Sequence, residues 1–149
     1  MEWKIKRFNE LTTEEVYKIL HLRSEVFVVE QNCVYQDCDN KDIEAEHLLC
    51  IEDNEVIATL RILNKGVSYD EISIGRVAVN KEYRRKDLGR KSMELAIEYI
   101  KEKHGFCPIR ISAQNYIKDF YKSLGFREVS DIYLEDDIPH IEMLHEMKN

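Results

Sequence analysis

The chain has 149 residues, the length of one ordinary domain, and 44% of them are hydrophobic, enough to bury a core. Its formal net charge of −7 at pH 7 argues against a general binder of nucleic acids or anionic membranes, which needs a broad basic surface. Residues 1–10 lack the apolar core of a signal peptide, and no window is apolar enough to span a bilayer. We therefore expect one cytoplasmic domain over residues 1–149, with neither nucleic acid nor membrane as a partner.

The N-terminal half predicts a strand, a long helix, a loop and a hairpin. Alternating side chains predict an edge strand over 2–8. A helix is predicted over 11–31, because Thr12 and Glu15 fit a capping box and apolar residues recur on one helical face. The polar segment 32–46 predicts a loop of a length that is usually functional or mobile. The hairpin strands are predicted at 47–52 and 56–63.

The rest of the chain alternates between strands and helices and ends on strands. These elements are predicted at 71–79, 89–103, 107–113, 116–126, 127–134 and 140–147. Gly125 is a good left-handed residue to end the second of these helices. The whole order, β-α-β-β-β-α-β-α-β-β, predicts a mixed α/β sheet with helices on its faces.

The four cysteines indicate a reducing compartment rather than a disulfide or metal site. Cys50 and Cys107 lie in apolar runs and are expected to be buried thiols. Cys33 and Cys38 are too far apart for the C-x-x-C spacing of a redox or zinc pair. Neighbouring acidic residues match no standard ligand set, so we expect no metal.

Basic residues gather where the strand 71–79 gives way to the helix 89–103. They are Arg84, Arg85, Lys86, Arg90 and Lys91. The first turn of a helix has unpaired N–H groups and a partial positive charge, so it can bind a phosphate. Gly89, with no Cβ, lets the backbone approach a ligand closely. An ordinary charged helix start is the alternative, but basic residues there oppose the helix dipole. The pattern predicts an anion site that suits a pyrophosphate.

The segment "YRRKDLGRKSMELAI" resembles motif A of the GNAT N-acetyltransferases, written Arg/Gln-x-x-Gly-x-Gly/Ala. Arg84 matches its first position and Gly89 its last, whereas Asp87 stands at the usual first glycine and adds a negative charge. The segment "FYKSLGF" at 120–126 resembles motif B of that family. Four collinear blocks between residues 22 and 143 resemble the ElaA-type subgroup: "LRSEVFVVEQNCVYQDCDNKD", "GRVAV", "AQNYIKDFYKSLGF" and "YLEDDIPHIEM".

This resemblance implies one GNAT domain with a mostly antiparallel sheet of six to seven strands flanked by helices. It also implies acetyl-CoA as donor, an amine as acceptor and a homodimer. In that family the strand before motif A splays from its neighbour, and the pantetheine arm lies in the gap. The cofactor-binding residues implied here are Arg76, Val77, Ala78, Val79, Arg84, Arg85, Lys86, Asp87, Leu88, Gly89, Arg90, Gln114 and Tyr121.

Direct acetyl transfer requires a neutral amine, a stabilised thioester oxygen and a proton donor for the thiolate. Val77 N–H is the candidate for the oxygen. Tyr121 matches the family's tyrosine acid, and a tyrosine with an ordinary pKa of ~10 keeps its proton at neutral pH. The alternative interpretation of Tyr121 is a core tyrosine on a helix face.

The general base and the acceptor site remain open in the sequence. His47 and His140 are candidate bases, because the ordinary pKa of histidine, ~6.5, suits that role at pH 7. Each is equally compatible with a hydrogen-bonded histidine at a strand start. The acidic loop 36–46 either attracts a cationic amine or is merely solvated. The expected substrate-binding residues are Glu30, Gln31, Asp37, Asp39, His47 and Arg76.

Two other functions compete with an amine acetyltransferase. Asp87 favours a CoA-binding sensor or interaction module without turnover. The segment "LRSEVFVVE" also resembles the acyl-homoserine-lactone synthases, which share the fold. The acceptor is not readable, because polyamines, amino sugars, antibiotics and protein N-termini all suit this fold.

Overall fold

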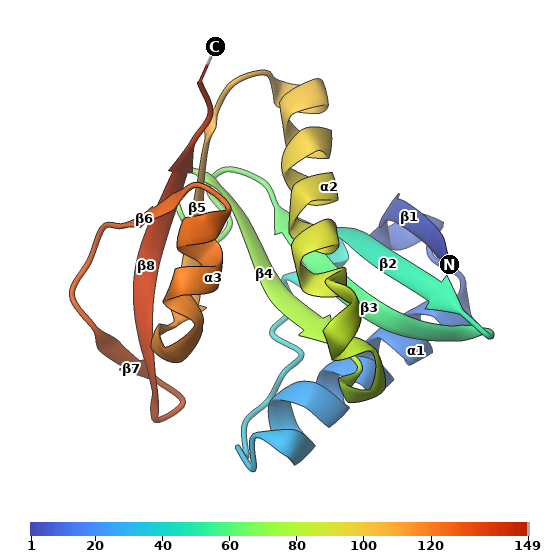
Figure 1. Cartoon of the computed structure of the whole chain (residues 1–149). Coiled ribbons are helices and arrows are strands. Elements are labelled where there is room, and N and C mark those ends of the chain that lie inside the picture. The colour runs from blue at the N-terminus through green and yellow to red at the C-terminus, as the bar shows by residue number, and fades with distance from the viewer. Residues whose placement is uncertain (149) are drawn as a thin grey trace.

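The computed structural model describes residues 1–148 around one eight-stranded sheet (Figure 1). Its strand order is β1-β2-β3-β4-β5-β8-β6, with β7 paired to β8. The strands are β1 (Glu2–Arg7), β2 (Glu46–Glu52), β3 (Glu55–Leu63), β4 (Ile72–Val79), β5 (Pro108–Gln114), β6 (Phe126–Glu128), β7 (Tyr133–Glu135) and β8 (Ile138–Glu146). The α-helices are α1 (Thr13–Arg23), α2 (Leu88–His104) and α3 (Lys118–Ser123). Neighbouring strands run antiparallel apart from β4 and β5, which confirms the mixed, mostly antiparallel α/β fold.

The sheet has eight strands rather than six to seven, because the segment 127–134, predicted as one strand, divides in two. Its first part belongs to β6, which pairs with residues 143–145 of β8. Its second part belongs to β7, which pairs with residues 138–140 of the same strand. The intervening residues leave the ladder, and alternation within the segment gives no sign of that departure.

The predicted helix over 11–31 begins as expected but changes its winding part-way. Thr12 Oγ1 accepts from Glu15 N at 3.1 Å, and Thr12 N donates to Glu15 Oε1 at 2.8 Å, so the capping box is confirmed. The α-helix ends at Arg23, and residues Ser24–Glu30 form a π-helical turn. Such turns are rare and are frequent at functional sites.

Helices α1 and α2 cover opposite faces of the sheet (Figure 1). Leu48 and Leu49 are consecutive and fully buried, so their side chains point to opposite faces of β2. Leu48 belongs to the core cluster that contains Met93 of α2, whereas Leu49 belongs to the cluster that contains Ile19 of α1. The sheet therefore has a core on each side.

The strands β4 and β5 separate soon after they begin. They pair only at Ile72 with Ile109 and at Ser73 with Arg110, and then diverge as Figure 1 shows. Beyond these pairs, β4 remains bonded to β3 and β5 to β8. The facing edges of β4 and β5 therefore carry backbone groups without a partner strand. The splayed strand expected from the resemblance is confirmed, and it opens a wedge in the sheet.

Two of the cysteines have the environment that the sequence predicts. Cys50 and Cys107 are buried free thiols, as predicted, and Cys38 is exposed. Within the described part of the chain, none of the helices combines the length and the apolar character needed to cross a membrane.

Candidate active site

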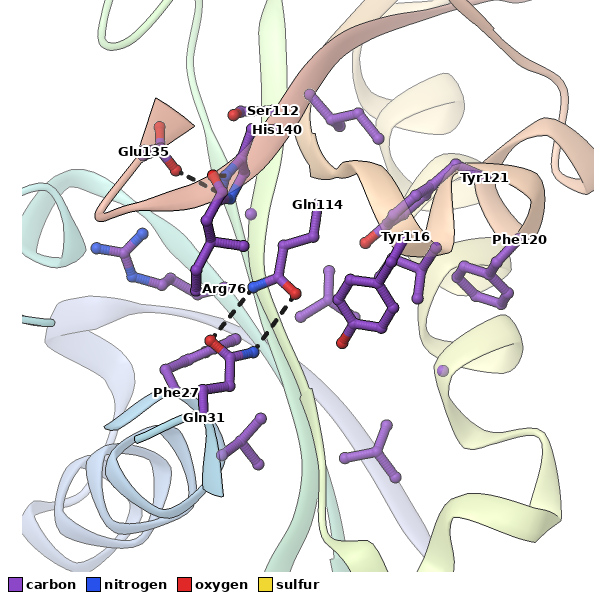
Figure 2. Close-up of a pocket in the computed structure, with 18 of the residues that line it drawn as sticks. Phe27, Gln31, Arg76, Ser112, Gln114, Tyr116, Phe120, Tyr121, Glu135 and His140 are labelled. Carbon is purple, nitrogen blue, oxygen red and sulfur yellow. Dashed lines mark hydrogen bonds and ion pairs between the residues drawn. The ribbon is translucent and has the colours of Figure 1, made fainter. Parts of the chain in front are cut away.

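A cavity of about 660 Å³ opens in the wedge between β4 and β5. Parts of β8, α3, the start of α2 and the π-helical turn complete its wall, and Figure 2 shows many of these side chains. The predicted site residues that line it are Glu30, Gln31, Arg76, Val77, Val79, Arg84, Asp87, Gly89, Arg90, Gln114, Tyr121 and His140. The predicted site residues outside this lining are Asp37, Asp39, His47, Ala78, Arg85, Lys86 and Leu88.

A bulge in β4 forms one wall of the cavity. Thr59 of β3 pairs with Ala78 and Arg61 pairs with Gly75, so two residues of β4 oppose one residue of β3. The first of the two, Arg76, has a φ of +52°, which residues other than glycine rarely adopt. A bulge interrupts the ladder and re-aims the backbone, and here it does so beside the wedge.

The basic loop leads into an open helix N-terminus. Residues Lys81–Lys86 form a 3₁₀-helix, Asp87 has a φ of +57°, and α2 begins at Leu88. Lys91 N donates to Asp87 O at 3.0 Å, so the N–H groups of residues 88–90 belong to the first turn and lack helical acceptors. The Asp87 side chain does not cap them. Its left-handed backbone accounts for the glycine usual at this position, and aspartate is among the few residues that tolerate it.

Two arginines, one from this loop and one from the first turn of α2, line the cavity. Arg84 Nη2 contacts both Glu30 carboxylate oxygens, at 2.6 and 2.8 Å, and Arg84 Nε donates to Val79 O at 3.1 Å. Arg90 Nη2 donates to Ser123 Oγ at 2.7 Å. The Glu30 contact links the π-helical turn to the motif A loop across the mouth of the wedge.

Gln31 and Gln114 form a second bridge across the cavity (Figure 2). Each side-chain amide donates to the oxygen of the other at 3.4 Å. These bonds are long, and a ligand amide offers the same donor and acceptor groups. The Gln31–Gln114 pair is therefore suited to open, so that a ligand amide takes the place of one of the two side chains.

Tyr121 projects from α3 with its hydroxyl toward the cavity (Figure 2). Its side chain packs edge-on against Phe120 and Phe126, with ring centroids 5.1 and 5.9 Å away, and the residue is 7% exposed. Burial raises the pKa of Tyr121 to about 12. The phenol therefore keeps its proton throughout the neutral range.

His140 lies on β8 and also lines the cavity. Its Nδ1 lies 2.7 Å from the carbonyl oxygen of Ile138, and a carbonyl can only accept, so Nδ1 carries a proton. Its Nε2 lies 3.3 Å from Glu135 Oε2, as the dashed line in Figure 2 marks. A carboxylate oxygen can only accept, so this contact is a hydrogen bond when Nε2 carries a proton.

His47, predicted as a base or substrate ligand, does not line this cavity. It is 2% exposed, and its Nε2 lies 2.8 Å from Asp42 O. Burial lowers the pKa of His47, which keeps the ring neutral inside the protein. The sequence shows a polar residue at a strand start, and the packing makes it a structural one.

Asp37 and Asp39, predicted as substrate ligands, do not line the cavity either. Asp37 Oδ2 accepts from Arg23 Nε at 2.8 Å, and Asp39 accepts from both terminal nitrogens of Arg61 at 2.7 Å. The charges of Asp37 and Asp39 are therefore balanced by arginines within the protein.

The structure adds cavity residues that sequence reasoning missed. Glu135 beside His140 and Ser112, whose hydroxyl meets that of Tyr133, both line the cavity. Two signals were available. Glu135 belongs to the same "YLEDDIPHIEM" block as His140, and Ser112 shares one face of β5 with Gln114.

The fold and the cleft together define an acyltransferase, and comparisons with known proteins give its family. The family model of the acetyltransferase (GNAT) domain matches residues 9–147. The chain is 37% identical to protein ElaA of Escherichia coli K12, over 99% of this chain and 97% of ElaA. The ElaA crystal structure superposes with a TM-score of 0.91 over 98% of this chain and 100% of that one. An acyl-CoA N-acyltransferase from Pseudomonas aeruginosa gives 0.92 at 38% identity, over 97% and 98%. The chain belongs to the GNAT acetyltransferase family.

Proposed function

We propose that this protein transfers the acetyl group of acetyl-CoA to a primary amine by direct attack through a tetrahedral intermediate. The observation that carries the proposal is the single cavity that runs between splayed strands. It joins an open helix N-terminus to the buried hydroxyl of Tyr121. One cavity therefore brings together a helix N-terminus that suits an anion, strand backbone without a partner strand, and a hydroxyl that can donate a proton.

The residues present suit a coenzyme with a pyrophosphate and a pantetheine arm. The N–H groups of residues 88–90 and the Arg84 guanidinium would hold the pyrophosphate. Backbone groups of 76–79 and the Gln114 amide would hold the amide-bearing arm in the manner of an added strand. The coenzyme supplies the activated acetyl group, and it is a co-substrate rather than a resident group.

His140 is the base of this proposal. An acceptor amine with an ordinary pKa of ~10.4 arrives protonated and must lose a proton before it can attack. Nε2 of His140 is the nitrogen that takes that proton, because Nδ1–H is held by Ile138 O, and once protonated Nε2 donates to Glu135. Glu135, 3.3 Å from Nε2, then balances the new positive charge.

Val77 and Tyr121 act on the thioester. The Val77 N–H at the bulge is the proposed donor to the thioester oxygen as negative charge develops there. Proton transfer from a tyrosine of pKa about 12 to a thiolate of ordinary pKa ~8.5 is uphill. Tyr121 therefore assists chiefly through the hydrogen bond it donates to the departing thiolate, and the proton that the attacking nitrogen loses as the tetrahedral intermediate collapses converts this thiolate to the thiol.

The proposed acceptor is a small-molecule or peptide amine. A cytoplasmic location and a homodimer remain predictions from the sequence. The feature that favoured a sensor without turnover, Asp87, has a conformational explanation in its φ of +57°. The near full-length likeness to ElaA gives no particular support to an acyl-homoserine-lactone synthase.

The test is acetyl-CoA consumption with a panel of primary amines, compared between wild type, Tyr121→Phe and Tyr116→Phe. Tyr116 lines the same cavity but is 75% exposed, so it is the matched control. We expect Tyr121→Phe to lower kcat by roughly 10²–10⁴-fold with little change in the KM for acetyl-CoA. Full activity of Tyr121→Phe would remove Tyr121 from the mechanism, and no transfer to any amine by wild type would overturn the proposal.

A further inference from the structure

We propose that Asp37 and Asp39 are positioning residues for acyl transfer. By holding Arg76, they fix the β4 bulge that presents the Val77 N–H. The inference rests on the proposed function, because the position of this N–H matters only if a thioester oxygen lies against it. It also gives the acidic loop a role other than attracting the substrate.

The bulge needs an external support. Arg76 adopts a φ of +52°, a conformation that favours glycine and is strained for a side chain with a Cβ. Such conformations persist where the surrounding structure over-determines them, and they gather at functional sites. The residue lies directly before Val77 and lines the cavity across from Tyr121 (Figure 2).

The support comes through the Arg76 side chain. Its Nε forms an ion pair with Asp37 Oδ1 at 2.8 Å, and its Nη2 donates to Asp37 O at 3.0 Å. Nη2 also lies 3.4 Å from Asp39 Oδ2, and the guanidinium stacks 5.9 Å from the centre of the Tyr35 ring. Two carboxylates, one carbonyl and one aromatic face thus define a single position for the guanidinium.

The two carboxylates are themselves immobilised by other arginines. Arg23, 1% exposed, holds Asp37, and Arg61, 4% exposed, holds Asp39. Asp42 joins the two, at 2.7 Å from Arg23 Nη1 and 3.0 Å from Arg61 Nη1. The loop is therefore anchored to α1 and β3 before it meets Arg76, so it can transmit a fixed position to β4.

The experiment compares wild type with Arg76→Gln, Arg76→Gly and Asp39→Asn. Arg110→Gln is the control, because Arg110 of β5 is also paired to two carboxylates, those of Glu71 and Glu142. Its side chain has the same 22% exposure as that of Arg76, and it does not line the cavity. Three quantities are measured: acetyl-CoA affinity, kcat, and the infrared frequency of the thioester carbonyl in bound ¹³C-acetyl-CoA. The carbonyl frequency reports hydrogen bonding to the oxygen without any acceptor present.

We expect Arg76→Gln to lower kcat about 100-fold, as a small misplacement near the reacting atoms does, with acetyl-CoA affinity nearly unchanged. The bound carbonyl frequency should move back toward that of free acetyl-CoA. Asp39→Asn, which leaves Arg61 paired to Asp42, should give a smaller effect in the same direction. Arg76→Gly separates strain from support, because glycine adopts the backbone conformation freely but cannot be held. It should resemble Arg76→Gln.

The outcomes separate this inference from the proposed function. If wild type binds acetyl-CoA and transfers acetyl but Arg76→Gln matches it in kcat and carbonyl frequency, the inference is overturned and the function stands. If Arg76→Gly retains wild-type values, the side-chain contacts are not needed and the inference is likewise overturned. If wild type fails to bind acetyl-CoA, the proposed function falls first, and this inference falls with it.

Discussion

Arg76 and Arg84 line the same cavity but differ in side-chain exposure and in the number of their carboxylate partners. Arg76, with a side chain 22% exposed, contacts carboxylates that are themselves held by buried arginines. Arg84, with a side chain 46% exposed, has one carboxylate partner, Glu30, at the mouth of the wedge. Both carry the same charge and both stand in recognisable motifs.

The difference shows that a cationic side chain is available to a ligand only if its partner can be displaced. The charge of Arg76 is balanced within a network that would have to break as a whole. The pair of Arg84 with Glu30 is partly exposed, with side-chain exposures of 46% and 19%, and such pairs are worth only about 1 kcal/mol, so an incoming phosphate can replace Glu30 at little cost. These contacts favour Arg84 over Arg76 as the ligand of the coenzyme in the proposed function.

The largest expected effect comes from breaking the buried network at Asp42. Asp42→Ala would leave Arg23 and Arg61 each without one of its carboxylate contacts. We expect a loss of about 3–5 kcal/mol in the free energy of unfolding, measured by urea denaturation. Glu146→Gln, which breaks an exposed pair with Arg127, is the control and should leave the midpoint unchanged. An Asp42→Ala protein of wild-type stability would contradict the network's role.

The second effect is on coenzyme affinity at Arg84. Arg84→Ala should weaken CoA binding by roughly 10–100-fold in isothermal titration, because a charge-assisted contact to phosphate is lost. Arg85 is adjacent but does not line the cavity, so Arg85→Ala should bind nearly as wild type does. Equal losses in the two variants would mean that general positive charge, rather than the Arg84 contact, attracts the coenzyme.

A smaller effect with the opposite sign is expected at Glu30. Glu30→Gln removes the carboxylate that competes with phosphate for Arg84. Its expected result is CoA binding up to about fivefold tighter, since that factor corresponds to about 1 kcal/mol. The same titration decides the matter, and weaker binding in Glu30→Gln would show that Glu30 orients Arg84 instead of competing for it.

The smallest effect is a pH dependence of stability from the buried network. Burial alone would raise the pKa of Asp39 and of Asp42, but hydrogen bonds and charge from Arg61 and Arg23 outweigh it and lower both. The folded state therefore favours the ionised forms. Their contribution is complete above the unfolded pKa of ~3.9 and is lost as pH falls through the lower folded values.

Urea midpoints measured from pH 7 to pH 3 should fall mainly below about pH 4, and less steeply in Asp39→Asn than in wild type. An unchanged slope in that variant would mean that Asp39 does not contribute to the acid sensitivity.

Local patterns in the sequence determined much of the fold. The Thr12 capping box, the hairpin and the helix over 89–103 depend on residues close together in the chain, and the structure places them within a few residues of the prediction. The basic loop before α2 was found for the same reason. The motif resemblance supplied the wedge and Tyr121, because both belong to short contiguous blocks.

Only the tertiary structure decided how the charges are paired. Arg76 meets Asp37 across 39 positions of the chain, and Arg84 meets Glu30 across 54, so no local pattern relates them. For this reason the sequence groups Asp37, Asp39 and His47 with the site residues although they do not line the cavity, whereas Glu135 was missed beside His140. The sequence by itself identified the motifs whose ionisable groups gather at and around the site. Packing decided which of them are neutralised, because burial and partners are set by strands brought together from distant parts of the chain.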